Sequence, residues 1–284
     1  MGATMAVGAF ICPASDYDVE EDVEAFNALA AQQANCRGPL SRPEGPEQVV
    51  ETRPMYAFED GTSYTGDWVG TMRHGQGLQV GTDGSRYEGE WAMDAACGKG
   101  KMEYPDGDVY RGEWQDNLRH GSGSYSHPDG MKYEGHWAND VYHGSGSEVF
   151  RDGSTYTGQY KEGQRHGHGR AVFADGTWHE GEFVDGEMCG HGRRVWQDGS
   201  MYEGQWVGQT MHGEGAYTFA DGRVYEGDFE CDMMHGFGSM TFTDGGRYEG
   251  EWHAGKQHGS GVFHALGKTR QGLWEHGEHT GWTD

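Results

Sequence analysis

The chain has 284 residues, of which 51 are Gly, 34% are hydrophobic and 13% are aromatic. A compact domain of this length usually carries more aliphatic side chains, so one large central core is not expected. With 46 acidic and 21 basic residues, the formal charge is −25. That charge excludes nucleic acid as a natural partner and opposes binding to an anionic membrane surface.

The first 53 residues differ in composition from the rest and are predicted to form a non-repeat N-terminal extension. Residues 1–12 are apolar and uncharged, acidic residues follow, and three prolines precede the change at residue 54. Between residues 16 and 35, the spacing of Val19, Val23 and Phe26 predicts one amphipathic helix. This helix either packs over the first repeat and covers its exposed edge, or reaches a neighbouring molecule.

The extreme N-terminus raises the question of lipid attachment. Gly2 follows Met1, but Ala6 stands where a myristoylation motif has Ser or Thr, and Cys12 is a second conceivable acylation site. Acylation at either position is left open. No apolar stretch approaches the length of a membrane span, and no Lys or Arg precedes the apolar run as in a secretory signal. The odd number of cysteines, five, fits a reduced, cytoplasmic protein.

From residue 54 to residue 284 the sequence is a repeat region with a period of 23 residues. Each repeat contains an aromatic-x-Gly-x-aromatic segment, called the box below, such as Tyr87 to Trp91. The box glycines are Gly66, Gly89, Gly112, Gly135, Gly158, Gly181, Gly204, Gly227 and Gly250, and Gly272 follows after 22 residues. A period held this strictly indicates one small structural unit stacked many times.

Two further glycine series keep the same phase. Asp-Gly recurs from Asp60-Gly61 to Asp244-Gly245, and Gly-x-Gly recurs from Gly75/Gly77 to Gly259/Gly261. Asp-Gly between alternating segments is a hairpin signal, because Gly supplies the positive φ of a tight turn. We therefore expect a box strand, a loop of about six residues, Gly-x-Gly, a second strand and an Asp-Gly turn. Such a unit is a β-hairpin without a helix.

Alternation along a strand assigns the two faces of this hairpin. In Tyr87-Glu88-Gly89-Glu90-Trp91 the aromatic residues and the Gly point to one side, and the acidic residues point to the other. A lone hairpin cannot bury such rings, whereas stacked hairpins can. The aromatic face therefore serves packing between repeats, and in addition it is a candidate surface for a partner.

The box, His-Gly-x-Gly and Asp-Gly together resemble the MORN (membrane occupation and recognition nexus) repeat. The resemblance extends from about residue 54 to the end, with a half unit, nine full units and a degenerate last unit. Departures are His179 and Arg270 at the first aromatic position of a box, and Cys97 and Cys189 in place of the loop His. The resemblance implies an all-β fold: an elongated, single-sheet solenoid of stacked β-hairpins.

The polar face carries a stripe of acidic pairs. They are Glu88/Glu90, Glu180/Glu182, Glu226/Asp228 and Glu249/Glu251. Such a stripe is either a solvated face that prevents sheets from stacking, or a docking surface for a basic partner.

Neither a metal site nor an active site is predicted. Seven of the sixteen histidines precede Gly-x-Gly in successive repeats, from His74 to His258. Equivalent positions lie about 9.6 Å apart, too far to share one ion, so each loop His is expected to hydrogen-bond the turn backbone. Every candidate acid or base recurs in nearly every repeat, whereas an active site breaks the local pattern. We expect no cofactor and no enzymatic activity.

The predicted function is a scaffold that positions other proteins in a cytoskeletal or ciliary (axonemal) assembly. The resemblance points there, since radial-spoke head proteins are similar in having many such units and an acidic balance. The predicted groove for a peptide or helix consists of Tyr87, Trp91, Tyr110, Trp114, Tyr133, Trp137, Tyr156 and Tyr160. The last hairpin could pair two chains end to end. The alternatives are a membrane-tethering module, which the charge disfavours, and a regulatory subunit of a separate enzyme.

Overall fold

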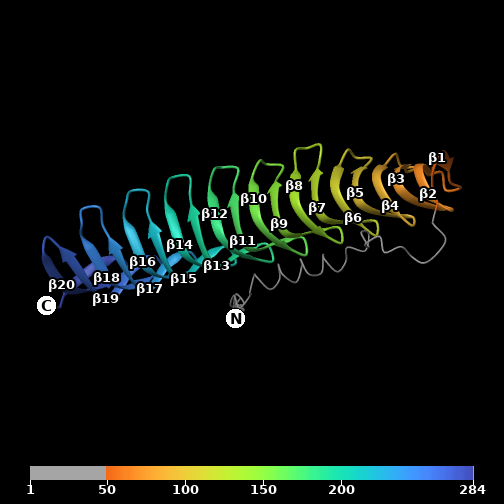
Figure 1. Cartoon of the computed structure of the whole chain (residues 1–284). Helices are drawn as coiled ribbons and strands as arrows, with labels where there is room; N and C mark the ends of the chain where they lie inside the picture. Colours follow the sequence, from red (N-terminus) through yellow and green to blue (C-terminus); the bar gives the residue numbers. More distant parts are fainter. Residues whose placement is uncertain (1–48, 284) are drawn as a thin grey trace, which may run out of the picture. The chain divides into compact units, whose positions relative to one another are not determined.

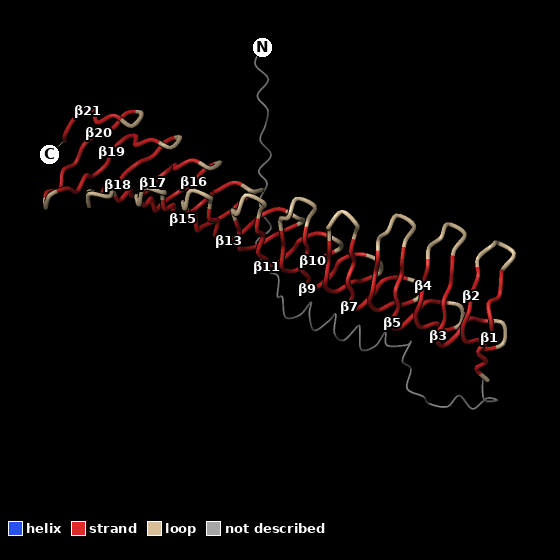
Figure 2. The backbone as a smooth tube through the Cα atoms, turned by 90° about the horizontal axis from the view of Figure 1, so that it is seen from above, coloured by secondary structure: helices blue, strands red, loops and turns tan. Residues whose placement is uncertain are grey.

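The computed structural model describes residues 49–283, which are all-β (Figure 1). The predicted N-terminal helix and both candidate acylation sites lie outside the described residues. The described chain divides into two units, residues 49–164 and residues 165–283, called the first unit and the second unit below. Within residues 49–283 there is no helix, and the loops all connect successive strands (Figure 2). In this part of the chain no helix could span a membrane.

Each unit is a series of short strands in chain order. The first unit contains β1 (Val50–Ala57), β2 (Ser63–Val69), β3 (Met72–Val80), β4 (Arg86–Ala92), β5 (Ala95–Glu103), β6 (Val109–Gln115), β7 (Leu118–Ser126), β8 (Lys132–Ala138), β9 (Val141–Val149) and β10 (Thr155–Lys161). The second unit contains β11 (Gln164–Val172), β12 (Trp178–Val184), β13 (Glu187–Val195), β14 (Met201–Val207), β15 (Thr210–Thr218), β16 (Val224–Glu230), β17 (Met233–Thr241), β18 (Arg247–His253), β19 (Lys256–Ala265), β20 (Lys268–Glu275) and β21 (Glu278–Trp282).

Within each unit, every strand pairs antiparallel with its neighbours in sequence, so the predicted single-sheet stack of hairpins is confirmed. The register aligns the glycines. In the first unit Gly146 of β9 lies opposite Gly135 of β8 on one side and opposite Gly158 of β10 on the other. In the second unit Gly215 holds the same place between Gly204 and Gly227. A row of glycines therefore crosses the strands of each sheet.

The connection between the box and Gly-x-Gly is tighter than predicted. Instead of a loop of about six residues, a two-residue turn joins strands of 7 and 9 residues, as at Asn139-Asp140 between β8 and β9. Both turn residues have positive φ angles, 49° and 71°. This conformation matches the twist of the flanking strands, and Asn and Asp tolerate it better than other non-glycine residues. The five-residue Asp-Gly connections lie at the other end of the strands.

The two-residue turns also bind one repeat to the previous one. Asp140 donates its backbone N–H to the carbonyl of Arg119, 21 residues earlier, at 3.0 Å. Its carboxylate accepts the Arg119 backbone N–H and the Arg119 Nε–H, both at 2.9 Å. Asp94 and Arg73 repeat the arrangement in the first unit. An acidic residue in the turn thus satisfies a backbone donor of the previous hairpin that would otherwise be left unpaired.

The two glycines of Gly-x-Gly are required for different reasons. Gly144 has a φ of 60°, in the left-handed region, and lies at the bulge where β9 shifts its register against β8. Gly146 has ordinary backbone geometry, but a Cβ there would lie 2.5 Å from the hydroxyl oxygen of Tyr133 and 2.7 Å from its ring. The Tyr ring therefore lies flat on the neighbouring strand, which only Gly permits.

The rings of successive boxes form the core of each unit. Tyr110 packs edge to face against Trp114 of its own box and Trp137 of the next, with ring centroids 5.2 and 5.1 Å apart. The Tyr hydroxyl donates to the carbonyl three residues later, at 2.9 Å for Tyr110, and Trp137 Nε1 donates to Gly123 O at 3.2 Å. The aromatic face is thus a chain of rings from box to box, and most of the box Tyr hydroxyls are hydrogen-bonded to backbone carbonyls, whereas the indole nitrogens of Trp68 and Trp114 have no partner among the described residues.

Gly146→Ala is expected to destabilise the first unit by about 1–3 kcal/mol, because the added methyl group overlaps the Tyr133 ring. Gly281→Ala is the matched control, since a Cβ at Gly281 meets nothing within 4 Å and its φ is not positive. The measurement is urea unfolding followed by tryptophan fluorescence. Equal midpoints for the two variants would contradict the packing role of the glycine row.

Candidate functional site

The structure brings the eight predicted groove residues together in the first unit, but as core. Their exposed fractions are 5% for Tyr87 and Trp91, 0% for Tyr110 and Tyr156, 8% for Trp114, 1% for Tyr133 and Trp137, and 4% for Tyr160. They contact one another from box to box, as Tyr87 does with Trp114 at 5.1 Å. Burial raises the pKa of Tyr110 and Tyr133 above the usual value. The rings stabilise the sheet, and partner binding through them stays a prediction.

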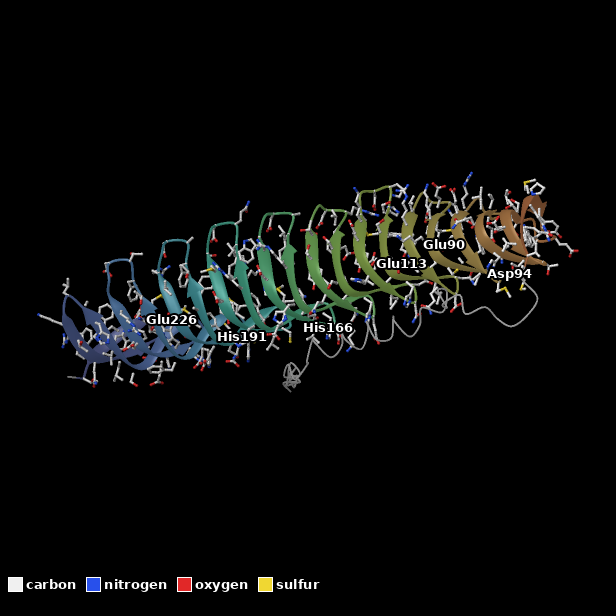
Figure 3. All side chains as sticks on the ribbon, viewed as in Figure 1. Glu90, Asp94, Glu113, His166, His191 and Glu226 are labelled. Atoms are coloured by element: carbon white, nitrogen blue, oxygen red, sulfur yellow. The ribbon has the colours of Figure 1, made fainter. Side chains whose placement is uncertain are left out.

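The acidic stripe has two kinds of member. The second acid of a box accepts the backbone N–H at the glycine bulge nine residues later: Lys99 N to Glu90 at 2.8 Å, and Phe237 N to Asp228 at 3.0 Å. The first acid points to solvent, as Glu88 and Glu226 do. Figure 3 labels Glu90 on β4 and Glu226 on β16. The second acids are therefore part of the hairpin. Of the first acids, Glu180 and Glu249 form ion pairs with Arg170 and Arg247, which leaves Glu88 and Glu226 facing solvent.

Glu90→Ala is expected to cost about 1 kcal/mol, because a charge-assisted hydrogen bond to the Lys99 backbone is lost at a partly exposed site. Glu88→Ala removes the same charge two residues away on the same face and is expected to leave stability nearly unchanged. Urea midpoints of the two variants measure the difference. If both substitutions cost the same, the second acid has no role in the bulge.

The loop histidines do not make the predicted hydrogen bond in three repeats. The Nδ1 atoms of His74, His120 and His258 are buried without a hydrogen-bond partner among the described residues. In this segment the backbone of the His makes the hydrogen bond instead of its side chain: the carbonyl of His74 accepts from the Tyr64 hydroxyl at 3.4 Å. Burial lowers the pKa of His120. Within residues 49–283 no group of three His, Cys, Asp or Glu side chains is arranged to hold a metal ion.

His179 replaces the box Tyr in the second unit and leaves a defect there. Its ring is fully buried and packs edge to face against Phe183 and Trp206, at 5.4 and 5.1 Å. Neither ring nitrogen has a hydrogen-bond partner in the described chain. Burial, aided by the nearby charge of Arg194, lowers the pKa of His179 from 6.5 to about 4. The imidazole has the shape of the missing ring without its hydroxyl contact.

His179→Tyr is expected to stabilise the second unit by about 1–2 kcal/mol at pH 7, because the hydroxyl restores the bond to the carbonyl of Glu182. Tyr202 makes the equivalent bond to Gln205 at 3.0 Å. The unfolded chain binds more protons than the folded chain between pH 4 and 6.5, so the contribution of His179 is complete above pH 6.5 and is lost toward pH 4.

The pH dependence gives this prediction a second measurement. As the pH falls from 6.5 to 4, the wild-type chain should lose up to about 1.4 kcal/mol of stability per pH unit relative to His179→Tyr. Parallel pH profiles for the two proteins, measured by urea unfolding from pH 4 to 7.5, would contradict the assignment of a neutral buried imidazole.

An exposed aromatic residue breaks the pattern of the polar face in the second unit. Phe237 occupies the middle position of Gly-x-Gly on β17 and is 63% exposed. Other repeats carry Ser122, Ser145, His191 or Ser260 there. The sequence analysis missed this residue, although comparing the middle positions of Gly-x-Gly across repeats would have found it.

The acids of the stripe surround Phe237. Its strand, β17, lies between β16 and β18, which carry Glu226/Asp228 and Glu249/Glu251. Phe237 lies opposite Glu251, and Glu226 lies opposite the next polar-face residue, Ser239. We call Phe237, Glu226, Asp228, Glu249 and Glu251 the Phe237 patch. It joins an apolar ring to several carboxylates on one surface.

The first unit has a shallow hollow on its polar face. Its volume is about 480 Å³, and its lining combines small and hydroxyl-bearing residues: Glu134, Ser145, Gly146, Ser147, Thr157, Gly158 and Gln159. The hydroxyls of Ser147 and Thr157 lie 3.1 Å apart. None of the eight predicted groove residues lines it.

Nine segments of the chain match the family model of the MORN repeat. They are residues 64–86, 87–109, 110–132, 133–155, 156–178, 179–201, 202–222, 225–247 and 248–265. The chain belongs to the MORN repeat family. Each match begins at the first aromatic position of a box. This position is occupied by the Tyr whose hydroxyl bonds the backbone, except in the sixth match, where it is His179. MORN repeats indicate a repeat-based scaffold for protein interactions.

Distant similarities to solved structures also exist. One is the TCP10 domain of Danio rerio CPAP, solved with a peptide of STIL: identity is 13%, coverage is 83% of this chain and 99% of that chain, and the TM-score is 0.43. Another is the TCP domain of Drosophila melanogaster SAS-4, solved with a proline-rich motif of Ana2, with 15% identity, 66% and 96% coverage, and a TM-score of 0.30. A search of curated proteins gave no match.

Proposed function

We propose that this MORN protein is a non-enzymatic scaffold that holds a basic segment of another protein on the Phe237 patch. The observation that carries the proposal is the 63% exposed ring of Phe237 on the face that carries the acidic stripe. The aromatic side chains of the boxes, by contrast, are almost fully buried. Because most of its surface is in contact with solvent, the ring is available for contact with another molecule.

The chemistry of the patch selects the partner. A ring bordered by carboxylates suits a segment in which Arg or Lys alternates with apolar residues, because the cation can lie over the ring and pair with an acid. Glu226 is exposed and lies opposite Ser239, the next residue of β17 on the same face as Phe237. The excess of negative charge on the whole chain, −25, accelerates the approach of such a partner.

The assembly that we propose is cytoskeletal or ciliary, and the compartment is the cytoplasm. Membership in the MORN family supports a scaffold, and the similarity of this acidic, many-repeat chain to radial-spoke head proteins favours the axoneme. The repetition of each candidate acid and base in successive boxes supports the absence of catalysis. End-to-end pairing of two chains through β21 remains part of the proposal.

Phe237→Ser tests the patch with little risk to the fold, because Ser occupies the same position in other repeats. The tagged full-length chain is cross-linked in its own cells, and bound proteins are quantified by mass spectrometry. We expect Phe237→Ser to reduce recovery of the specific partners about tenfold, as loss of a hot-spot residue does. Leu266→Ser, which removes an exposed apolar side chain from a turn, should leave recovery unchanged.

If Phe237→Ser retains every partner, the patch is not the docking surface. Detergent fractionation of the same cells then separates the alternatives. Retention in the insoluble pellet supports the cytoskeletal scaffold. Complete release by detergent contradicts it and supports a membrane tether or a soluble regulatory subunit.

A further inference from the structure

We infer that four histidines in the second unit form a binding site for a divalent transition-metal ion, with zinc as the natural choice. They are His235, His253, His258 and His276, called the histidine row below. Consecutive ring centroids are 5.2, 5.8 and 5.6 Å apart. No comparable run of four neighbouring imidazoles is found elsewhere among residues 49–283.

The row arises because two histidines depart from the repeat pattern. His235 on β17 and His258 on β19 belong to the loop series, whose members lie two strands, or about 9.6 Å, apart. His253 ends the intervening strand β18, where the boxes of β14 and β16 end in Val207 and Glu230. His276 is the first residue of the turn after β20, one position beyond the place that His253 holds in β18. Each of these two histidines lies one strand away from a loop-series histidine instead of two strands away. The distance between neighbouring imidazoles is therefore about half of that within the loop series.

The spacing fits chelation by neighbouring rings. Two imidazoles on one tetrahedral zinc ion, each with a Zn–N distance of about 2.1 Å, place their ring centres about 5 Å apart. The centroid distances on either side of His253, 5.2 and 5.8 Å, are close to this value. His253 is exposed and His235 and His258 are partly exposed, so an ion can reach the rings and the rings can rotate toward it.

Charged groups around the row favour a cation on balance. The Glu230 carboxylate lies 3.3 Å from His235 Nε2 and can supply an oxygen ligand. Glu251 on β18 accepts hydrogen bonds from the Ser260 hydroxyl and backbone N–H, which lower its pKa, and the nearby His258 lowers this pKa further. Lys256, opposite His253 in the β18–β19 register, is the one opposing charge in direct pairing with the row. His258 Nδ1 is buried without a partner, which leaves Nε2 as the atom for the metal.

The ion is held by two imidazoles with a carboxylate or water completing the shell, because no three ligands of residues 49–283 already stand in a coordinating arrangement. This predicts affinity well below that of a structural zinc site with four protein ligands. Imidazole and carboxylate ligands select zinc, nickel or copper over magnesium and calcium, which prefer oxygen alone. His253 belongs to the closest pair, with His235 at 5.2 Å, and also neighbours His258 at 5.8 Å, so it is the residue on which the site depends.

The test is calorimetric titration of the full-length chain with zinc chloride at pH 7.5, beside His253→Asn and the control His212→Asn. His212 holds the same repeat position as His235, but Val207 and Glu230 stand where His253 would be. We expect His253→Asn to weaken one binding event at least tenfold and His212→Asn to leave it unchanged. At pH 5.5 the wild-type affinity should also fall at least tenfold, because protons compete with metal ions for imidazole nitrogens.

Cobalt absorption spectra supply a second readout, since a visible band reports nitrogen coordination independently of heat. Thermal unfolding of His253→Asn without metal verifies that the fold is kept. Zinc binding that is equal in the wild type and His253→Asn overturns the proposal. So does an equal loss in His212→Asn, which would mean that scattered surface histidines bind the metal. Binding that persists unchanged at pH 5.5 would assign it to carboxylates instead.

Discussion

The structure depends on one contact: the Tyr ring of each box lying on a glycine of the neighbouring strand. At Gly146, and at its counterparts in other repeats, any side chain would overlap that ring. The contact fixes the ring's orientation, which directs the hydroxyl to the carbonyl three residues on and the ring edge toward the aromatic residue of the next box. Because a box Tyr contacts the second aromatic residue of its own box and that of the next box, a sheet one layer thick acquires a core without a second layer.

Much of this arrangement could be predicted from the sequence, and the reason is repetition. The strict period identified the hairpin, and alternation placed Tyr133, Gly135 and Trp137 on one face, as observed. The length of the connection could not be predicted, because Asn139-Asp140 forms a tight turn through positive φ angles that non-glycine residues seldom adopt. The hydrogen bond from the Arg119 backbone N–H to the Asp140 carboxylate stabilises this turn. It joins residues 21 positions apart, so the local sequence does not reveal it.

The predicted groove shows how the same reasoning reaches its limit. Alternation indicates which side chains share a face, but it does not say whether that face is covered. Tyr110 and Trp114 lie on the predicted face and are almost fully buried, since neighbouring boxes lie close enough for their rings to interlock. The acidic stripe shows the same limit, because acids on one face differ in whether they bond the backbone. Glu90 caps a bulge and Glu88 does not, although the sequence presents them as equivalent.

Function in a repeat protein should therefore be sought where a residue differs from those at the equivalent position of the other repeats. His179 departs in the core, and its unpaired nitrogens lower stability without creating a surface. Phe237 departs on the polar face and exposes an apolar ring among carboxylates. His253 and His276 depart at the ends of strands and place imidazoles beside those of the loop series. Because the second and third kinds of departure cost the fold little, selection for binding can retain them, whereas a defect like that of His179 must be offset by the stability of its neighbours.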